Sequence, residues 1–172
     1  MKVTRVTDEI RMRWSKLKHR VEENFAESIG ERVSIHSAAY GACSCGHAWL
    51  ALDGEVIANF CTRAHYNRFQ YGDKERDRGI TPEQTKRHKD QFVDYGEISR
   101  QDVYEACWAF VHELSFDDAL GSDDPLIQSL AVLDRRLGKR RYTQVRDSTL
   151  HPLARKLFET RMACEIKPHH AR

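Results

Sequence analysis

The sequence predicts an α+β fold: an N-terminal helix, a three-stranded antiparallel meander, and a helical C-terminal half packed on the sheet. Three observations predict it. Apolar residues recur at helical spacing near the start, side chains alternate on both sides of an Asp-Gly pair, and helical spacing returns from residue 99. A chain of 172 residues can bury a hydrophobic core, so we predict a single domain over residues 1–172.

The first predicted element is an amphipathic helix over residues 13–29. Its apolar residues lie three or four positions apart and share one face, while Lys, Arg and Glu cover the remainder. That apolar stripe consists of Trp14, Leu17, Val21, Phe25 and Ile29. Gly30 follows and favours a left-handed end to the helix.

Three strands are predicted next, over residues 32–40, 47–52 and 55–62. Asp53-Gly54 favours a tight hairpin between the last two strands, because both turn positions need positive φ. The short link at residues 41–46 favours antiparallel pairing of the first two strands.

Alternation divides the side chains of these strands between two faces of the sheet. One face is apolar, and the first helix is its predicted cover: Val33, Ile35, Leu50, Leu52, Val56, Ala58 and Phe60. The other face carries polar and aromatic groups: Ser34, His36, Tyr40, His47, Trp49, Asn59 and Cys61.

The remainder of the chain is predicted to be helical after a polar surface excursion at residues 71–90. A helix over residues 99–114 opens with a capping-box-like Ser-x-x-Asp, and a short turn follows at residues 115–120. A leucine-rich helix begins at Pro125, runs through Leu137 and ends at Gly138. The last helix covers about residues 152–164, and residues 166–172 are predicted to form a frayed tail.

Composition limits the classes of function. The net charge of +2 is too small to indicate nucleic acid by itself. No apolar run approaches the roughly 18 residues of a membrane span, and the N-terminus lacks an apolar signal core, so we predict a cytoplasmic protein that does not engage a membrane. Five cysteines without a signal sequence favour reduced thiols or a metal site over disulfides.

Four stretches together carry a resemblance: RWSKLKHRVEENF, GHAWLALDGEVIANFCT, SFDDALGSDDPLIQSLAVLDRR and LGKRR. They resemble an uncharacterised family of bacterial proteins marked by a Trp-Ser-Lys-Leu-Lys segment and a Leu-Asp-Arg-Arg-x-Gly-Lys-Arg-Arg segment. The resemblance covers most of the chain and implies no activity, cofactor or partner.

The segment AVLDRRLGKRR at residues 131–141 has two interpretations. In the first, Arg135 and Arg136 lie in the last turn of a helix and stabilise its exposed carbonyls, and a partly buried Asp134 pairs with an arginine. In the second, basic side chains contact phosphate oxygens or another partner. The residues that remain as candidates for this contact are Lys139, Arg140 and Arg141.

Cysteine and histidine side chains gather around the hairpin, at Cys43, Cys45, His47, Cys61 and His65. Zinc binds four such ligands, although Cys-x-Cys differs from the usual Cys-x-x-Cys spacing. A second possibility is a thiol nucleophile, in which Cys45 or Cys61 pairs with His36 or His47 and Asn59 orients the imidazole.

The polar face of the sheet is a further candidate, as a ligand pocket or a partner surface formed by His36, Tyr40, His47 and Trp49. The alternative is that the C-terminal helices cover this face. The leading hypothesis is a small cytosolic binding or regulatory module for a protein or nucleic acid, with no catalytic residue and no cofactor assigned. The alternative hypothesis is a thiol- or zinc-dependent enzyme, or a zinc-stabilised domain, that uses Cys43, Cys45, His47 and Cys61.

Overall fold

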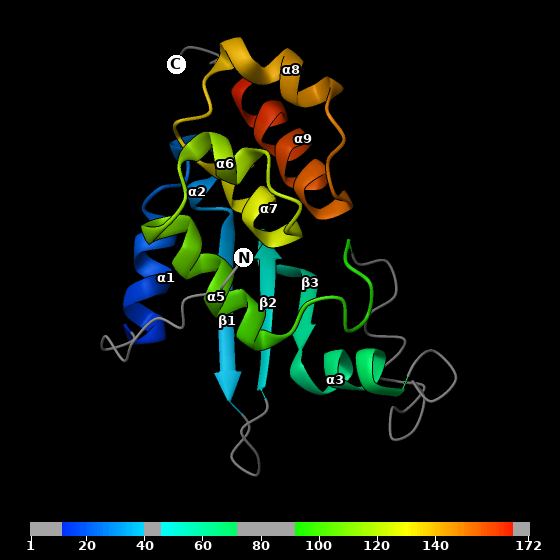
Figure 1. Ribbon diagram of the computed structural model, residues 1–172. Coiled ribbons are helices and arrows are strands. Elements are labelled where there is room, and N and C mark those ends of the chain that lie inside the picture. Colours follow the sequence, from blue (N-terminus) through cyan, green and yellow to red (C-terminus); the bar gives the residue numbers. More distant parts are fainter. Residues whose placement is uncertain (1–11, 40–45, 72–91, 167–172) are drawn as a thin grey trace.

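The computed structural model describes residues 12–39, 46–71 and 92–166 of the chain. It confirms the predicted order of an N-terminal helical region, a three-stranded antiparallel sheet and a helical C-terminal half (Figure 1). Among the described residues, no helix is both long enough and apolar enough to cross a membrane.

The N-terminal helical region is divided, so the prediction of one helix over residues 13–29 is wrong. Helix α1 spans Trp14–Glu22 and helix α2 spans Glu27–Gly30. Between them Phe25 forms an isolated antiparallel bridge with Asp134, because Ala26 N–H donates to Leu133 O (2.8 Å). This pairing replaces intrahelical hydrogen bonds, so the chain leaves the helix without burying unpaired backbone groups.

The sheet has the order β1-β2-β3, with β1 spanning Val33–Ala39, β2 spanning Gly46–Leu52 and β3 spanning Glu55–Cys61. The hairpin turn is as predicted, because Asp53 and Gly54 have φ values of 54° and 81°. The free edge of β1 is partly covered by α1, where the Glu22 carboxylate accepts a hydrogen bond from Ile35 N–H (3.1 Å).

A β-bulge changes which face one side chain occupies. Leu50 pairs with Ala58 but Ala51 pairs with Val56, so Ile57 is the extra residue of β3. The prediction that Val56 belongs to the apolar face is therefore wrong, and its side chain is 45% exposed.

The apolar face, hereafter the first face, is buried in the core together with helices α1 and α5. Its buried side chains are Val33, Ile35, Ala48, Leu50, Leu52, Ala58 and Phe60. Figure 1 shows α1 and α5 beside this sheet, with the remaining C-terminal helices grouped at one end of the strands.

Strand β3 leads directly into helix α3, Thr62–Tyr71, which alternation alone does not predict. The segment after residue 91 returns to the sheet, where Phe92 N–H donates to Ile57 O (3.2 Å). Most of the predicted polar excursion at residues 71–90 lies outside the described residues, as does nearly all of the predicted tail at residues 166–172.

Helix α5, Arg100–His112, begins with the predicted capping box, in which Ser99 and Asp102 exchange side-chain and backbone hydrogen bonds. Helix α6 spans Phe116–Leu120, where a turn was predicted. Helix α9, Pro152–Ile166, packs against α7 and agrees with the predicted last helix.

Helix α7, Pro125–Leu133, begins at the predicted proline but ends four residues before the predicted Leu137. Asp134 adopts an extended conformation (φ −65°, ψ 132°) and stops the helix. Two short elements follow that the sequence pattern does not predict: the 3₁₀ helix η1, Lys139–Arg141, and helix α8, Tyr142–Asp147.

Candidate functional site

Residues 134–141, hereafter the basic turn, connect α7 to α8. Asp134 is fully buried, and its carboxylate accepts hydrogen bonds from the backbone N–H of Arg136 (2.7 Å) and from its guanidinium (Nη2–Oδ2, 2.6 Å). The predicted pairing of Asp134 with an arginine is confirmed. The predicted place of Arg135 and Arg136 in the last turn of a helix is wrong, because the helix ends at Leu133.

Arg161 of α9 holds the backbone of the basic turn from the inside. Its guanidinium is 3% exposed. It donates to the carbonyl oxygens of Val132 (2.9 Å), Asp134 (2.8 Å) and Leu137 (2.8 Å). These three bonds satisfy buried carbonyls at the end of α7 and within the basic turn, and they hold its backbone against α9.

Glu165 supplies the negative charge that accompanies Arg161 in this buried region. Its carboxylate accepts hydrogen bonds from Arg161 Nε (2.9 Å), Ser28 Oγ (2.9 Å) and the Tyr142 hydroxyl. Burial opposes ionisation, but these hydrogen bonds outweigh it and lower the pKa of Glu165. Burial, followed by the contact with Glu165, raises the pKa of Tyr142 to about 12.

The role of Arg161 is not among the predictions from the sequence, although the sequence contains a signal for it. Within α9, the buried residues Ala154, Leu157 and Phe158 recur at helical spacing, and Arg161 falls on the same face. A cation at a core position requires buried acceptors. The three carbonyls of the basic turn are those acceptors.

The basic side chains of the turn divide into held and free groups. Arg136 is held by Asp134, as predicted for Asp134, whereas Arg141, a predicted partner contact, is held by Asp117 (Nη1–Oδ1, 2.6 Å). The guanidinium carbons of these two arginines lie 5.2 and 5.5 Å from the centroid of the Phe116 ring. The exposed side chains of Arg135, Lys139 and Arg140 make no hydrogen bond or ion pair with any described residue.

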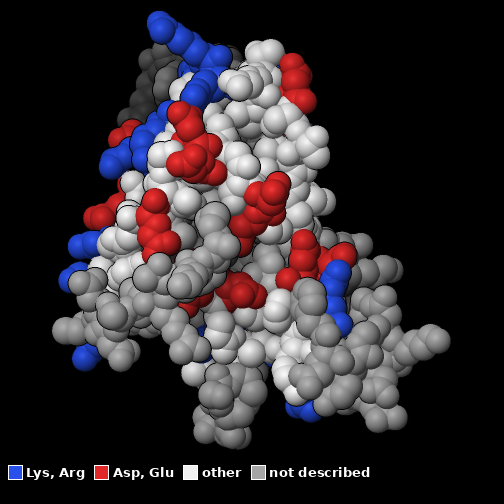
Figure 2. All heavy atoms as spheres, viewed as in Figure 1, with Lys and Arg blue, Asp and Glu red and all other residues white. Residues whose placement is uncertain are grey.

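Charge is unevenly distributed on the surface. Figure 2 shows Lys and Arg side chains gathered along the upper and left edge, where Figure 1 places the basic turn and α1. Acidic side chains occupy the facing surface over α5, α6 and α7. The basic turn therefore lies in a positive region, next to a negative one.

The polar face of the sheet, hereafter the second face, has the predicted register. His36 lies opposite Trp49, Trp49 opposite Asn59, and His47 opposite Cys61. The rings of His36 and His47 both stack with the Trp49 indole, at centroid distances of 5.0 and 4.9 Å. Tyr40, the fourth residue predicted here, lies outside the described residues.

Helix α5 packs on the first face, so the predicted cover of the second face by this helix is wrong. Arg100 Nε at the start of α5 donates to Ser37 Oγ (2.8 Å), and Ser37 lies opposite the buried Ala48 of the first face. On the second face, His36, His47 and Trp49 are all half-buried.

Replacing His36 with glutamine is expected to reduce the loss of folding stability that occurs as the pH falls. Burial, then the nearby Lys18, lowers the pKa of His36 in the folded protein. The unfolded chain therefore takes up the proton first, so stability is complete above the ordinary histidine pKa of about 6.5 and declines as pH falls below it. Urea unfolding at pH 7.5 and 5 measures this decline, which should be smaller in His36→Gln. His19→Gln, at an exposed histidine, is the control, and an equal decline in wild type and His36→Gln contradicts the prediction.

The described residues contain only part of the predicted cysteine and histidine cluster, because Cys43 and Cys45 lie outside them. Of the predicted ligands that are described, His65 Nδ1 bonds to Gly96 O (3.0 Å) and Cys61 ends β3. Within residues 12–39, 46–71 and 92–166, no three His, Cys, Asp or Glu side chains are grouped to hold a metal ion. The zinc site stays a prediction.

The predicted thiol nucleophile is assembled only in part. His47 Nε2 donates to Asn59 Oδ1 (2.6 Å), which is the expected orienting contact. Cys61 lies opposite His47 across the strands, but the two side chains share no hydrogen bond in the structure. A second thiol, Cys107, is buried within α5, and burial raises its pKa to about 12, so this cysteine serves as a core residue.

No curated protein and no solved structure matches the chain. The model of one protein family does match, over residues 13–162, from the start of α1 nearly to the end of α9. The matched range includes the whole sheet and the basic turn with its buried partner Arg161. The chain therefore belongs to the SF0329 protein family.

Proposed function

We propose that this protein is a small binding module for nucleic acid, and that the basic turn contacts the phosphate backbone. The observation that carries the proposal is the set of exposed, unpaired cations held on a rigid frame: Arg135, Lys139 and Arg140. Arg161 fixes the backbone beneath them, so binding does not have to order the turn.

The sequence hypothesis of Lys139, Arg140 and Arg141 as the partner-binding group is modified in this proposal. Arg141 already pairs with Asp117, whereas Arg135 has no such partner among the described residues. Arg141 becomes a support at the edge of the surface, and Arg135 takes its place among the contacting cations. Exposed guanidinium and ammonium groups are the usual contacts to phosphate oxygens.

The surface of the basic turn favours nucleic acid over a protein partner. Protein interfaces usually have an apolar centre. The large apolar side chains of this region, Leu137 and Tyr142, are buried. Phe116 is flanked by two guanidinium groups. What remains exposed is charge, which suits contacts to a backbone that do not depend on base sequence.

The proposed setting is the bacterial cytoplasm, where both nucleic acid and reduced thiols are present. Cys61, Cys107 and Cys164 are free thiols in the described part of the chain, which agrees with a reducing compartment. We further propose that the Trp-Ser-Lys-Leu-Lys and Asp-Arg-Arg-x-Gly-Lys-Arg-Arg segments mark the family. Both lie within the matched range.

Charge reversal at the turn tests the proposal. We expect Lys139→Glu/Arg140→Glu to weaken binding of a labelled 20-nucleotide single-stranded RNA by at least about tenfold at 50 mM salt. For the single-stranded RNA, the slope of log affinity against log salt should fall by about 1.4, or about 0.7 for each lost phosphate contact. Fluorescence anisotropy between 50 and 200 mM salt, with a DNA duplex as second probe, measures both quantities.

Arg13→Glu/Arg63→Glu is the matched control, because it makes the same change in net charge at exposed arginines before α1 and in α3. The control should retain most of the affinity. No binding by wild type, or equal loss in both double variants, would overturn the proposal. Binding to polyglutamate without binding to nucleic acid would also overturn it, in favour of an acidic protein partner.

A further inference from the structure

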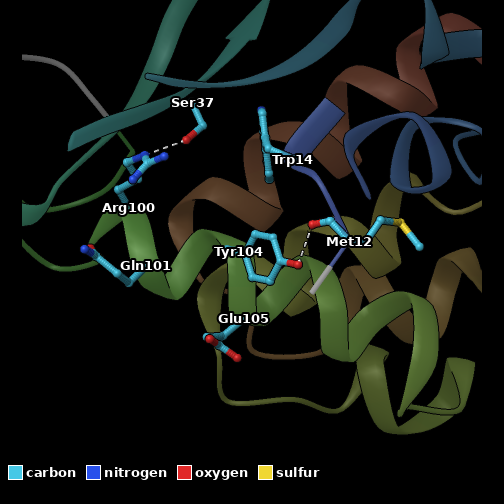
Figure 3. A pocket seen from close by; sticks show the side chains of 7 residues that line it. All are labelled: Met12, Trp14, Ser37, Arg100, Gln101, Tyr104 and Glu105. Atoms are coloured by element: carbon cyan, nitrogen blue, oxygen red, sulfur yellow. Dashed lines mark hydrogen bonds between the residues drawn. The ribbon is translucent and has the colours of Figure 1, made fainter. Parts of the chain in front are cut away.

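A pocket of about 240 Å³ lies between the starts of α1 and α5 and the end of β1 (Figure 3). Its lining residues are Met12, Trp14, Ser37, Arg100, Gln101, Tyr104 and Glu105. It is separate from the basic turn, which follows α7. Its volume is below the usual range of about 300–1,000 Å³ for ligand pockets, so it suits a compact molecule and not a dinucleotide.

Arg100 is the cationic group of this pocket, and its surroundings fix its position. Its Nε donates to Ser37 Oγ (2.8 Å), which leaves the two terminal nitrogens of the guanidinium. They make no hydrogen bond or ion pair with any described residue. The side chain passes over Gly46, where an added Cβ would lie 2.3 Å from Arg100 Cδ. The absence of a side chain at position 46 therefore leaves the space that Arg100 occupies.

The terminal edge of a guanidinium binds a carboxylate through two parallel hydrogen bonds. Arg100 is also the first residue of α5, a helix of 13 residues, whose N-terminal end favours a negative charge. The half-buried arginine and the helix end therefore favour the same kind of ligand group. That group is an anion held by a fixed fork of donors.

Aromatic side chains form the other walls. Figure 3 shows the Tyr104 ring between Arg100 and Met12, with Trp14 above it. Tyr104 is held in place because its hydroxyl donates to Met12 O (2.7 Å). Flat rings of this kind favour stacked or edge-on contacts with another ring. Glu105 also lines the pocket and disfavours a second negative charge on the ligand.

We propose that this pocket binds a small aromatic monocarboxylate. The carboxylate accepts hydrogen bonds from the terminal nitrogens of Arg100, and the ring lies against Tyr104 and Trp14. This ligand site is additional to the nucleic-acid contact at the basic turn and does not depend on it.

The probe is 4-hydroxybenzoate, compared with its neutral isostere 4-hydroxybenzamide. Titrations followed by two-dimensional amide NMR give the affinity and the location of binding. We expect the acid to bind wild type at least about tenfold more tightly than the amide, with shifts in the first turn of α5. Arg100→Gln should remove this preference, and Arg100→Lys should retain only part of it, because lysine keeps the charge but lacks the fork.

Arg63→Gln, at an exposed arginine of α3, is the control and should keep the preference for the acid. Ser37→Ala is a second test, because it leaves the charge of Arg100 unchanged and removes the contact that positions it. It should weaken binding of the acid more than binding of the amide, and it decides the question if Arg100→Gln does not fold. Equal affinity of wild type for acid and amide, an unchanged preference in the Arg100 variants, or shifts confined to another region would overturn the proposal.

Discussion

Replacing Arg161 with methionine is expected to lower the free energy of unfolding by about 3–5 kcal/mol, the usual cost of removing one partner of a buried ion pair. The substitution leaves Glu165 without its cation and leaves the carbonyls of Val132, Asp134 and Leu137 without their buried donor. Methionine fills similar space, so a cavity contributes little to this loss. Urea unfolding at pH 7 measures the difference.

Arg155→Met is the matched control for this prediction. Arg155 lies in the same helix and also donates to two backbone carbonyls, those of Arg146 (2.8 Å) and Ser148 (2.7 Å). These bonds are exposed, and water replaces them, so the expected loss is below about 1 kcal/mol. If Arg161→Met and Arg155→Met had similar effects, Arg161 would not be the buried support that the structure indicates.

The second large effect is expected at Gly96, where an alanine should cost about 3 kcal/mol through left-handed strain and overpacking. Gly96 has φ +74°, and a Cβ there would lie 2.5 Å from the carbonyl oxygen of Ala64. The contact is with backbone, which cannot rotate away as a side chain would. To remove this clash, α3 must move away from the segment at residues 92–99. Thermal and urea unfolding of Gly96→Ala measure the loss.

Gly54 is the control that separates the cost of a positive φ from the cost of a steric clash with a neighbouring atom. It also has a positive φ, +81°, but a Cβ there would meet no atom within 4 Å. Gly54→Ala should therefore cost only about 1 kcal/mol, the conformational part. Equal losses at the two glycines would mean that the close approach of Gly96 to Ala64 contributes nothing to stability.

Elements specified by neighbouring residues were predictable from the sequence. The Asp53-Gly54 turn depends on two adjacent residues that tolerate positive φ, and the capping box of α5 depends on Ser99 and Asp102. The start of α7 at Pro125 has the same local character. Each of these features was placed correctly.

Elements specified by distant residues were not predictable. The end of α1 at Glu22 depends on backbone pairing near Phe25 with the chain near Asp134, and helical spacing continues past this point without interruption. The exposure of Val56 depends on one extra residue in β3, which alternation cannot reveal. In both cases the local sequence pattern is compatible with two local conformations, and pairing with a distant part of the chain selects one of them.

In the candidate site, too, features set by neighbouring residues were predictable and features set by distant residues were not. The sequence located the cluster of basic residues and the pairing of Asp134, because charges close in sequence are visible in it. It did not predict that Arg141 is paired, because the partner of Arg141 is Asp117, contributed by α6. The pocket at Arg100 was missed because its walls come from three separate parts of the chain.

The dependence of the basic turn on Arg161 also fixes when the turn can form during synthesis. Residues 134–141 leave the ribosome before α9, so the nascent turn has its cations but not the guanidinium that orders its backbone. The turn acquires its fixed shape only after α9 has emerged and docked. A chain that stops before residue 161 thus retains the basic sequence and lacks the ordered surface, so the shape of this surface depends on completion of the fold.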